Sequence, residues 1–190
     1  MIDTVRQVVQ DGARSPLRAM SSRFAQATRM KPDTLVIVHP VAGGGRPLGA
    51  ERLVASCLAA HGCLAEFVRS RSLEDVRELA AWAAGSGFRY VVALGGDGAF
   101  QHLIEGLNGT EAIAGFFPAG NGNDVARSLG IPADPVRAAD SFLHSRPRTI
   151  DLVRVTLRDH HQALYAGACG MGLEQKQRML RTPDSRNGPA

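Results

Sequence analysis

Short runs of apolar residues alternate with longer amphipathic stretches along the middle of the chain. The short runs are typical of buried strands, whereas apolar residues that recur every three or four positions predict helices. The pattern predicts strands over residues 35–38, 64–68, 90–94 and 112–117, and helices over 48–60, 72–84, 125–129 and 134–144. Strands separated by helices in this way indicate an α/β fold with a doubly wound, mainly parallel sheet.

The pattern changes after Thr149. Residues 150–157 and 162–168 are apolar and strand-like, and only the polar segment from Arg158 to His161 separates them. Such a short connection predicts a β-hairpin. We therefore expect an antiparallel β unit to begin near the C-terminal end of the chain.

Glycine-rich loops follow the first, third and fourth of the predicted strands. Their sequences are Gly43-Gly44-Gly45, Gly95-Gly96-Asp97-Gly98 and Gly120-Asn121-Gly122-Asn123-Asp124. Glycine lets backbone N–H groups approach an anion closely, and a carboxylate nearby can hold Mg²⁺ against phosphate oxygens. In open α/β sheets, ligands bind at the carboxyl ends of the strands, where these loops lie. The loops therefore predict a nucleotide site.

Two common nucleotide-binding patterns are absent. The sequence has no Gly-x-x-x-x-Gly-Lys-Ser/Thr, which excludes an ordinary P-loop enzyme. A Rossmann fingerprint is excluded because the turn after the first strand reads Gly43-Gly44-Gly45-Arg46-Pro47. The three cysteines have no Cys-x-x-Cys spacing, which argues against a disulfide framework or a zinc site and favours a reducing, cytoplasmic setting.

The net charge of +4 comes entirely from the first 31 residues. This leader holds six Lys and Arg against two Asp, whereas residues 32–190 hold sixteen of each sign. Its basic residues alternate with apolar ones, a pattern that can lie on an anionic membrane surface. A docked or frayed extension and an organellar transit peptide are the alternatives. No apolar run approaches the roughly 18 residues of a membrane span, so we expect a cytoplasmic protein, with peripheral contact at the inner membrane surface as an option.

The loops and their surroundings resemble the catalytic domain of diacylglycerol kinases, sphingosine kinases and bacterial lipid kinases, a fold also similar to that of NAD kinases. The resemblance covers residues 34–174 and rests on the three loops, on the string from Pro118 to Pro132 and on Ile150-Asp151-Leu152. It implies transfer of a phosphoryl group from ATP with Mg²⁺ to a lipid alcohol. Nucleotide and lipid are the implied partners, and we expect no nucleic acid.

The resemblance also implies roles for individual residues. Asp97 would be the catalytic carboxylate, and Asp97 and Asp124 would organise Mg²⁺. Asp124 has an alternative role as an N-cap or first-turn acid of the helix that follows it. The residues expected to contact the nucleotide are Gly43, Gly44, Gly95, Gly96, Gly98, Gly120, Asn121, Gly122, Asn123 and Asp124.

The chain departs from the family pattern at places that matter. Ala99 stands where the family usually has Thr, Gln101-His102 where it tends to have Asn-Glu, and Asn121 where it has Thr. A lost hydrogen bond to a charged phosphate costs about 1.5–3 kcal/mol. A noncatalytic nucleotide-binding module is therefore the second hypothesis. A NAD kinase-like activity is the third, although the string from Pro118 to Pro132 favours the lipid kinases.

We expect four regions in all. They are a basic leader over 1–31, an α/β nucleotide-binding domain over 32–148, the start of a truncated β domain over 149–178 and a disordered tail over 179–190. The family would continue well beyond residue 174, through a β domain that supplies much of the acceptor pocket. The resemblance therefore places acceptor recognition outside this sequence.

Overall fold

The computed structural model describes residues 2–10, 32–156 and 162–166. Seven strands in these ranges form one sheet in the order β3-β2-β4-β5-β1-β6-β7. Strands β3, β2, β4 and β5 are parallel to one another, and β6 pairs with β7 in antiparallel fashion. The strands are β1 (Ile2–Gln10), β2 (Thr34–Val38), β3 (Ala65–Arg69), β4 (Tyr90–Gly95), β5 (Ile113–Pro118), β6 (Pro147–Thr156) and β7 (Gln162–Tyr165).

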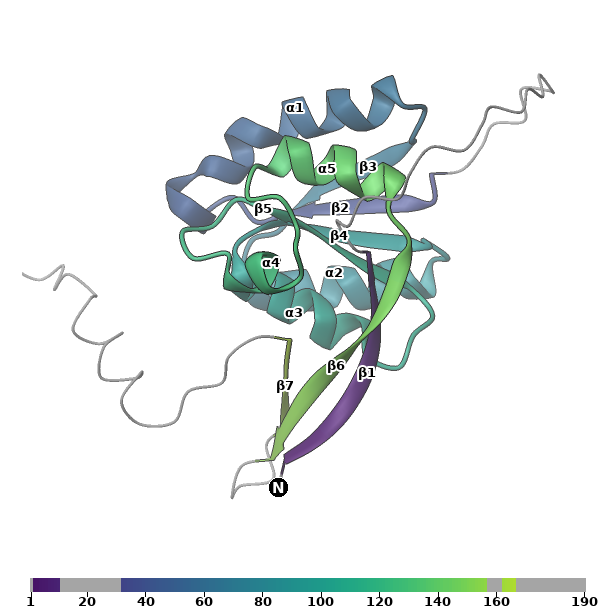
Figure 1. Ribbon diagram of the computed structural model, residues 1–190, viewed down its shortest axis with the longest axis vertical. Coiled ribbons are helices and arrows are strands. Elements are labelled where there is room, and N and C mark those ends of the chain that lie inside the picture. The colour runs from purple at the N-terminus through teal and green to yellow at the C-terminus, as the bar shows by residue number, and fades with distance from the viewer. Residues whose placement is uncertain (1, 11–31, 157–161, 167–190) are drawn as a thin grey trace, which may run out of the picture.

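The helices cover both faces of the parallel part of the sheet, which confirms the predicted doubly wound α/β fold. Helices α1 and α5 lie together on one face, and α2 and α3 lie together on the other (Figure 1). The helices are α1 (Arg46–Ala60), α2 (Leu73–Gly85), α3 (Asp97–Leu107), α4 (Asp124–Ser128) and α5 (Pro135–His144), with a 3₁₀ turn η1 (Ala42–Gly44) before α1.

The core lies between the central strands and the two helix layers. Every residue of β2 is buried, as is every residue of β5. Phe100 of α3 stacks on Phe116 of β5 with ring centroids 4.7 Å apart. Helices α2 and α3 approach closely, since a Cβ atom at Gly106 would lie 2.3 Å from the Arg77 carbonyl oxygen. Burial on both faces explains why the central strands are continuous apolar runs rather than alternating ones.

The predicted cap of α2 is present. The Ser72 hydroxyl accepts a hydrogen bond from the Asp75 backbone N–H, at 3.1 Å. Asp75 does not reach back to Ser72 as in a full capping box. Its carboxylate instead accepts hydrogen bonds from the backbone and guanidinium of Arg71. This partner lowers the pKa of Asp75 from 3.8 to about 2.

The first part of the basic leader is a strand of the sheet. Strand β1 runs parallel to β5 and antiparallel to β6. This arrangement corresponds to the docked alternative for residues 2–10, rather than to a segment free to lie on a membrane. Residues 11–31, which carry most of the leader's basic residues, lie outside the described part of the chain.

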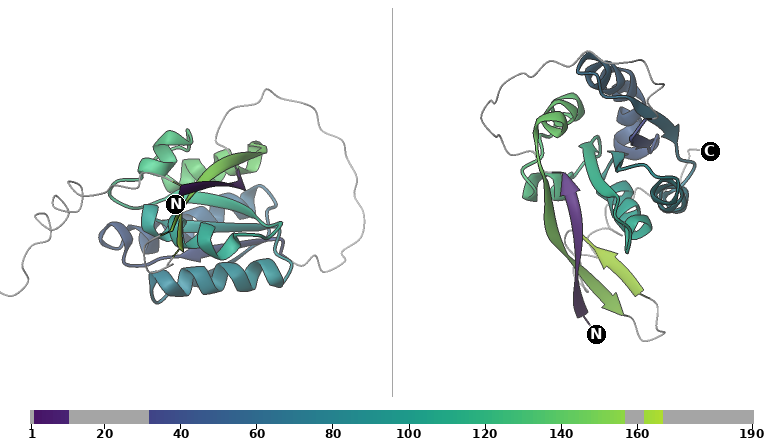
Figure 2. Two further views of the ribbon diagram at one scale, coloured as in Figure 1. Left: turned by 90° about the horizontal axis from the view of Figure 1, so that it is seen from below. Right: turned by 90° about the vertical axis from the view of Figure 1, so that its right-hand side faces the viewer.

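The predicted C-terminal hairpin is present as β6 and β7. These strands continue the same sheet through β1, and together they extend away from the α/β body (Figure 2). Whether residues 149–178 begin a separate domain stays a prediction, and the predicted tail over 179–190 lies outside the described residues. None of the helices that the structure describes is long and apolar enough to cross a membrane.

Candidate functional site

The three glycine loops meet at one edge of the sheet. The first loop (residues 39–45) follows β2, the second (residues 95–98) ends β4, and the third (residues 119–124) follows β5. These three strands are neighbours and parallel, so their carboxyl ends deliver the loops side by side. The fold therefore brings together the segments that the sequence predicts to bind a nucleotide.

The first and third loops are in direct backbone contact. Gly43 has a φ of +52°, and a Cβ atom there would lie 2.3 Å from the Ala119 carbonyl oxygen. Arg46, the first residue of α1, donates a hydrogen bond from Nη1 to the Gly120 carbonyl oxygen at 3.1 Å. Only glycine fits at position 43, because both the backbone conformation and the space exclude a side chain.

The second and third loops also touch through their backbones. A Cβ atom at Gly120 would lie 2.5 Å from the Cα atom of Gly96. Asn123 closes the third loop on itself: its side chain accepts a hydrogen bond from the Gly120 N–H and donates one to the Gly120 carbonyl, both at 3.0 Å. Asn123 has a φ of +52°, a left-handed conformation that Asn tolerates better than most residues.

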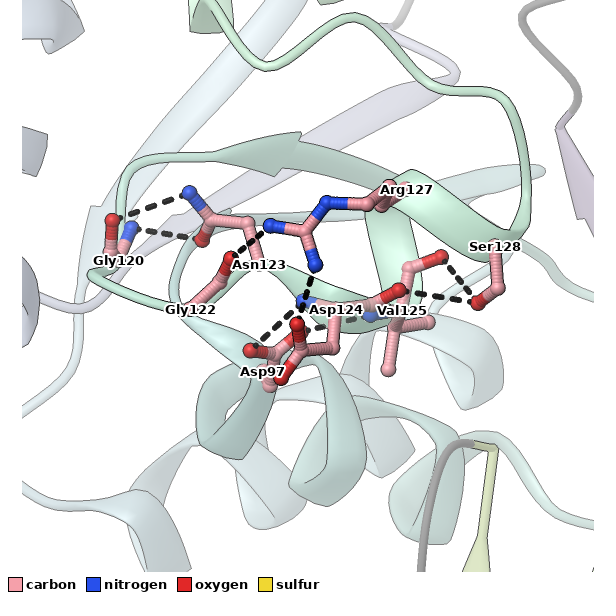
Figure 3. A network of polar contacts seen from close by, with 8 residues as sticks. All are labelled: Asp97, Gly120, Gly122, Asn123, Asp124, Val125, Arg127 and Ser128. Atoms are coloured by element: carbon pink, nitrogen blue, oxygen red, sulfur yellow. Dashed lines mark hydrogen bonds and ion pairs between the residues drawn. The ribbon is translucent and has the colours of Figure 1, made fainter.

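Asp97 joins the second loop to the start of α4. It is the first residue of α3, and its two carboxylate oxygens accept hydrogen bonds from the backbone N–H groups of Asp124, at 3.2 Å, and Val125, at 3.0 Å. Asp97 thereby satisfies two of the free amides at the N-terminus of α4. Figure 3 shows this carboxylate below the backbone of the third loop.

Asp124 and Arg127 complete the network. The Asp124 carboxylate forms an ion pair with Arg127, whose second guanidinium nitrogen donates to the Gly122 carbonyl oxygen at 3.0 Å (Figure 3). Asp124 is a first-turn acid of α4, as the alternative reading of this residue predicts, while Asn123 occupies the N-cap position. The Asp124 and Arg127 side chains are both mostly exposed.

The arrangement matches a known protein family over most of the described chain. Residues 33–155 match the diacylglycerol kinase catalytic domain. The chain belongs to the diacylglycerol kinase catalytic domain family. This confirms the resemblance that the loops indicate.

Relatives of this family share part of their length with the chain. A diacylglycerol kinase of Mycobacterium tuberculosis (strain ATCC 25618 / H37Rv) is 34% identical over 129 residues, which are 63% of this chain and 39% of that protein. A protein named "Probable lipid kinase YegS-like" from Pseudomonas putida is 39% identical over 80 residues, covering 41% of this chain and 27% of that protein.

A solved structure supports the fold. The crystal structure of a diacylglycerol kinase from Bacillus anthracis strain Sterne superposes with a TM-score of 0.51 at 26% identity, covering 57% of this chain and 40% of that chain. The match thus spans about two fifths of the length of the Mycobacterium tuberculosis and Bacillus anthracis proteins, and about a quarter of that of the Pseudomonas putida protein.

Gly122 lies where the two acidic side chains of this diacylglycerol kinase-family site converge. A Cβ atom there would lie 3.2 Å from Oδ2 of Asp97 and 3.3 Å from Oδ2 of Asp124. Glycine therefore keeps open the space between two carboxylates that come from different loops. Carboxylate oxygens are the protein ligands that Mg²⁺ prefers, so the donor set fits this ion.

The remaining residues implied by the family resemblance line the same edge. Gly95 ends β4, and a Cβ atom there would lie 2.9 Å from the Cβ atom of Ala99. A Cβ atom at Gly44 would meet nothing within 4 Å, and one at Gly98 would meet only the side chain of Leu73. Asn121 is exposed at the tip of the third loop. The structure brings all the predicted residues to one edge of the sheet.

Two residues beside the loops were missed by the sequence reasoning. Arg46 places an exposed guanidinium between the first and third loops. His39 is buried at the end of β2, with Nδ1 2.9 Å from Oγ of Ser70. Burial, with a smaller effect from His102, lowers the pKa of His39. The sequence feature that could have identified Arg46 is its position directly after a glycine run, at the first residue of a helix.

Proposed function

We propose that the chain is the nucleotide-binding part of a lipid kinase, which transfers the γ-phosphoryl group of ATP to the hydroxyl of a diacylglycerol-like lipid. The observation that carries this proposal is the meeting of three glycine loops at one edge of the sheet, where the second and third loops bring together the carboxylates of Asp97 and Asp124. Membership of the diacylglycerol kinase catalytic domain family and the names of the relatives support it.

The residues suit phosphoryl transfer, which depends mainly on positioning and on neutralisation of phosphate charge. Backbone N–H groups of the glycine loops would bind phosphate oxygens, and the N-terminus of α3 directs its partial positive charge toward the same edge. Arg46 donates one hydrogen bond to Gly120 and has further N–H donors for an anion. Asp97 and Asp124 would hold Mg²⁺, which neutralises charge on the transferred group when bound.

Asp97 has a structural role as well as the proposed one, so its test needs a matched control. Asp134 is that control, because its carboxylate caps α5, the helix after the third loop and α4, by accepting a hydrogen bond from the Arg137 N–H at 2.8 Å. Both Asp97→Ala and Asp134→Ala remove a carboxylate that accepts hydrogen bonds from backbone amides at a helix N-terminus, at a cost of about 0.5–2 kcal/mol. Only Asp97→Ala removes a proposed Mg²⁺ ligand.

Calorimetric titration with Mg-ATP separates the two roles. The wild-type chain and Asp134→Ala should bind alike, whereas Asp97→Ala should bind roughly ten- to a hundredfold more weakly, the equivalent of about 1.5–3 kcal/mol. Equal affinity in all three proteins, measured well below their unfolding temperatures, would sink the role assigned to Asp97.

A noncatalytic nucleotide-binding module is the second candidate. Two observations favour it: both Asp97 oxygens already accept backbone hydrogen bonds, and Ala99 offers no hydroxyl where the family usually has one. The candidates differ in one measurement, transfer of radiolabelled phosphate from ATP to diacylglycerol in mixed micelles. Mg-ATP binding with transfer supports the kinase, and binding without transfer supports the module.

Peripheral contact with anionic lipid remains part of the proposal. Within residues 11–31, Arg14, Arg18 and Arg23 are basic positions outside β1. Each basic residue near an anionic surface contributes about 1 kcal/mol. Replacing the three with Gln should therefore strongly reduce sedimentation with phosphatidylserine vesicles, while leaving β1 intact. An unchanged pellet fraction would refute the contact.

A further inference from the structure

Two pairs of potential metal ligands face each other on neighbouring helices, away from the glycine loops. Cys57 and His61 lie four residues apart at the end of α1, and Asp140 and His144 lie four residues apart in α5. Residues four apart share one face of a helix. Helices α1 and α5 lie side by side on the same face of the sheet (Figures 1 and 2).

The ligand atoms of three of these residues already lie together. A sulfur of Cys57, a ring nitrogen of His61 and a carboxylate oxygen of Asp140 are all within 4.8 Å of one another. The separation between Nε2 of His61 and Oδ1 of Asp140 is 3.7 Å. The ring of His144 stands edge-on to that of His61, with centroids 5.6 Å apart. His144 therefore adjoins the three-residue cluster through its contact with His61.

Both histidines are held in the tautomer that binds a metal through Nε2. Nδ1 of His61 lies 2.9 Å from the Cys57 carbonyl oxygen, and Nδ1 of His144 lies 2.8 Å from the Asp140 carbonyl oxygen. A carbonyl oxygen only accepts hydrogen bonds, so each Nδ1 carries the proton and the neutral ring keeps its lone pair on Nε2. Metal-ligating histidines are commonly oriented by such a bond.

We propose that Cys57, His61 and Asp140, with His144 as the fourth ligand, bind a zinc-type transition-metal ion. A thiolate, imidazoles and a carboxylate form a set that Zn²⁺ accepts in tetrahedral geometry, whereas Mg²⁺ and Ca²⁺ prefer oxygen ligands alone. The missing Cys-x-x-Cys spacing does not bear on this site, because its ligands come from two helices that are distant in sequence.

The site is separate from the proposed nucleotide site. Cys57 lies eleven residues after Arg46 along α1, about 16 Å along the helix axis at 1.5 Å per residue. A metal ion here would connect the C-terminal end of α1 to α5 across one helix layer. It would therefore act on the stability of that layer, and its binding can be measured without reference to ATP.

Titration of the full chain with Co²⁺ under reducing conditions tests the site, because a Co²⁺–thiolate bond gives a charge-transfer absorption. We expect one Co²⁺ per chain, with this absorption present and abolished by added Zn²⁺. The matched control is Cys63→Ser: Cys63 is also half-buried, but its sulfur faces Thr34 rather than the cluster. Cys63→Ser should leave the absorption unchanged, and Cys57→Ser should abolish it.

Further variants define the ligand set. His61→Ala and Asp140→Asn should each weaken Zn²⁺ binding more than about tenfold. Weaker binding in His144→Ala supports four protein ligands, and unchanged binding removes His144 from the set. Circular dichroism of the metal-free variants reports folding, and a Zn²⁺-dependent rise in the melting temperature of the wild type that Cys57→Ser lacks is an independent readout. Absence of the thiolate absorption in the wild type, or its retention in Cys57→Ser, would overturn the proposal.

Discussion

The contact between the first and third glycine loops can be tested with two neighbouring substitutions, Gly43→Ala and Gly44→Ala. Both glycines have positive φ, +52° at Gly43 and +70° at Gly44. A Cβ atom at Gly44 meets nothing within 4 Å, whereas one at Gly43 would lie 2.3 Å from the Ala119 carbonyl oxygen. The pair therefore shares backbone strain and differs in the steric contact.

The expected magnitudes follow from these two terms. A non-glycine residue in the left-handed conformation costs about 1–2 kcal/mol, which both variants share. Overpacking against backbone that cannot move aside adds about 1–3 kcal/mol at Gly43 alone. We therefore expect Gly44→Ala to lose about 1–2 kcal/mol of unfolding free energy and Gly43→Ala about 2–5 kcal/mol.

Urea denaturation of both variants and the wild type measures these losses, and Mg-ATP titration measures their effect on binding. Gly43→Ala should weaken Mg-ATP binding more than Gly44→Ala, because it separates two loops that together form the proposed phosphate site. Equal losses of unfolding free energy in the two variants would refute the close approach of Gly43 to Ala119.

Three further comparisons test the fold. Phe100→Ala should lose about 3–5 kcal/mol of unfolding free energy, since Phe100 is fully buried, whereas Trp82→Ala, at a position that is 55% exposed, should lose much less in the same urea experiment. Arg71 lowers the pKa of Asp75 from 3.8 to about 2. The ionised Asp75 carboxylate therefore stabilises the fold fully above pH 3.8, and this stabilisation is lost as the pH falls through about 2. Between these pH values, the unfolding free energy of the wild type should fall more steeply with decreasing pH than that of Asp75→Asn. Parallel plots of unfolding free energy against pH for the two proteins would contradict the ion pair. Ser72→Ala should lose about 1 kcal/mol while Ser72→Asp retains the cap, and equal stability of the two would exclude the capping bond.

Much of the fold could be predicted because its elements depend on local patterns. The buried strands β2, β4 and β5 are continuous apolar runs that are followed by, or end in, glycine or proline. The N-caps of α2 and α5 are polar residues at the first positions of the predicted helical ranges. Strand β1 could not be predicted as part of the sheet, because both its partners lie more than a hundred residues away.

The register of β1 shows what the sequence reasoning lacked. Arg6 lies opposite Asp151, and Asp3 lies opposite Arg154. Local reasoning assigned the basic residue Arg6 to a possible membrane contact, since its position in the sheet is known only once β1 and β6 are aligned.

The candidate site was predictable in its residues but not in its contacts. The glycine-rich sequences identify the three loops, and the parallel arrangement of the strands before them places these loops at one edge of the sheet. The contacts depend on how loops that are distant in the sequence are placed relative to one another. The α4 amides donate to Asp97 of another loop, and Arg46 donates to Gly120, which lies 74 residues away. Four-residue spacings likewise mark each half of the proposed metal cluster, but only the packing of α1 against α5 joins the halves.

The central claim is that a nucleotide binds where the three glycine loops meet. It is tested most directly by titrating the isotopically labelled chain with Mg-ATP and following backbone amide resonances by NMR. We predict that the amides of the three loops, those of Gly43, Gly96 and Gly120 among them, shift together and saturate with one affinity. Unchanged loop amides, or shifts confined to the opposite end of α1 near Cys57, would contradict the claim.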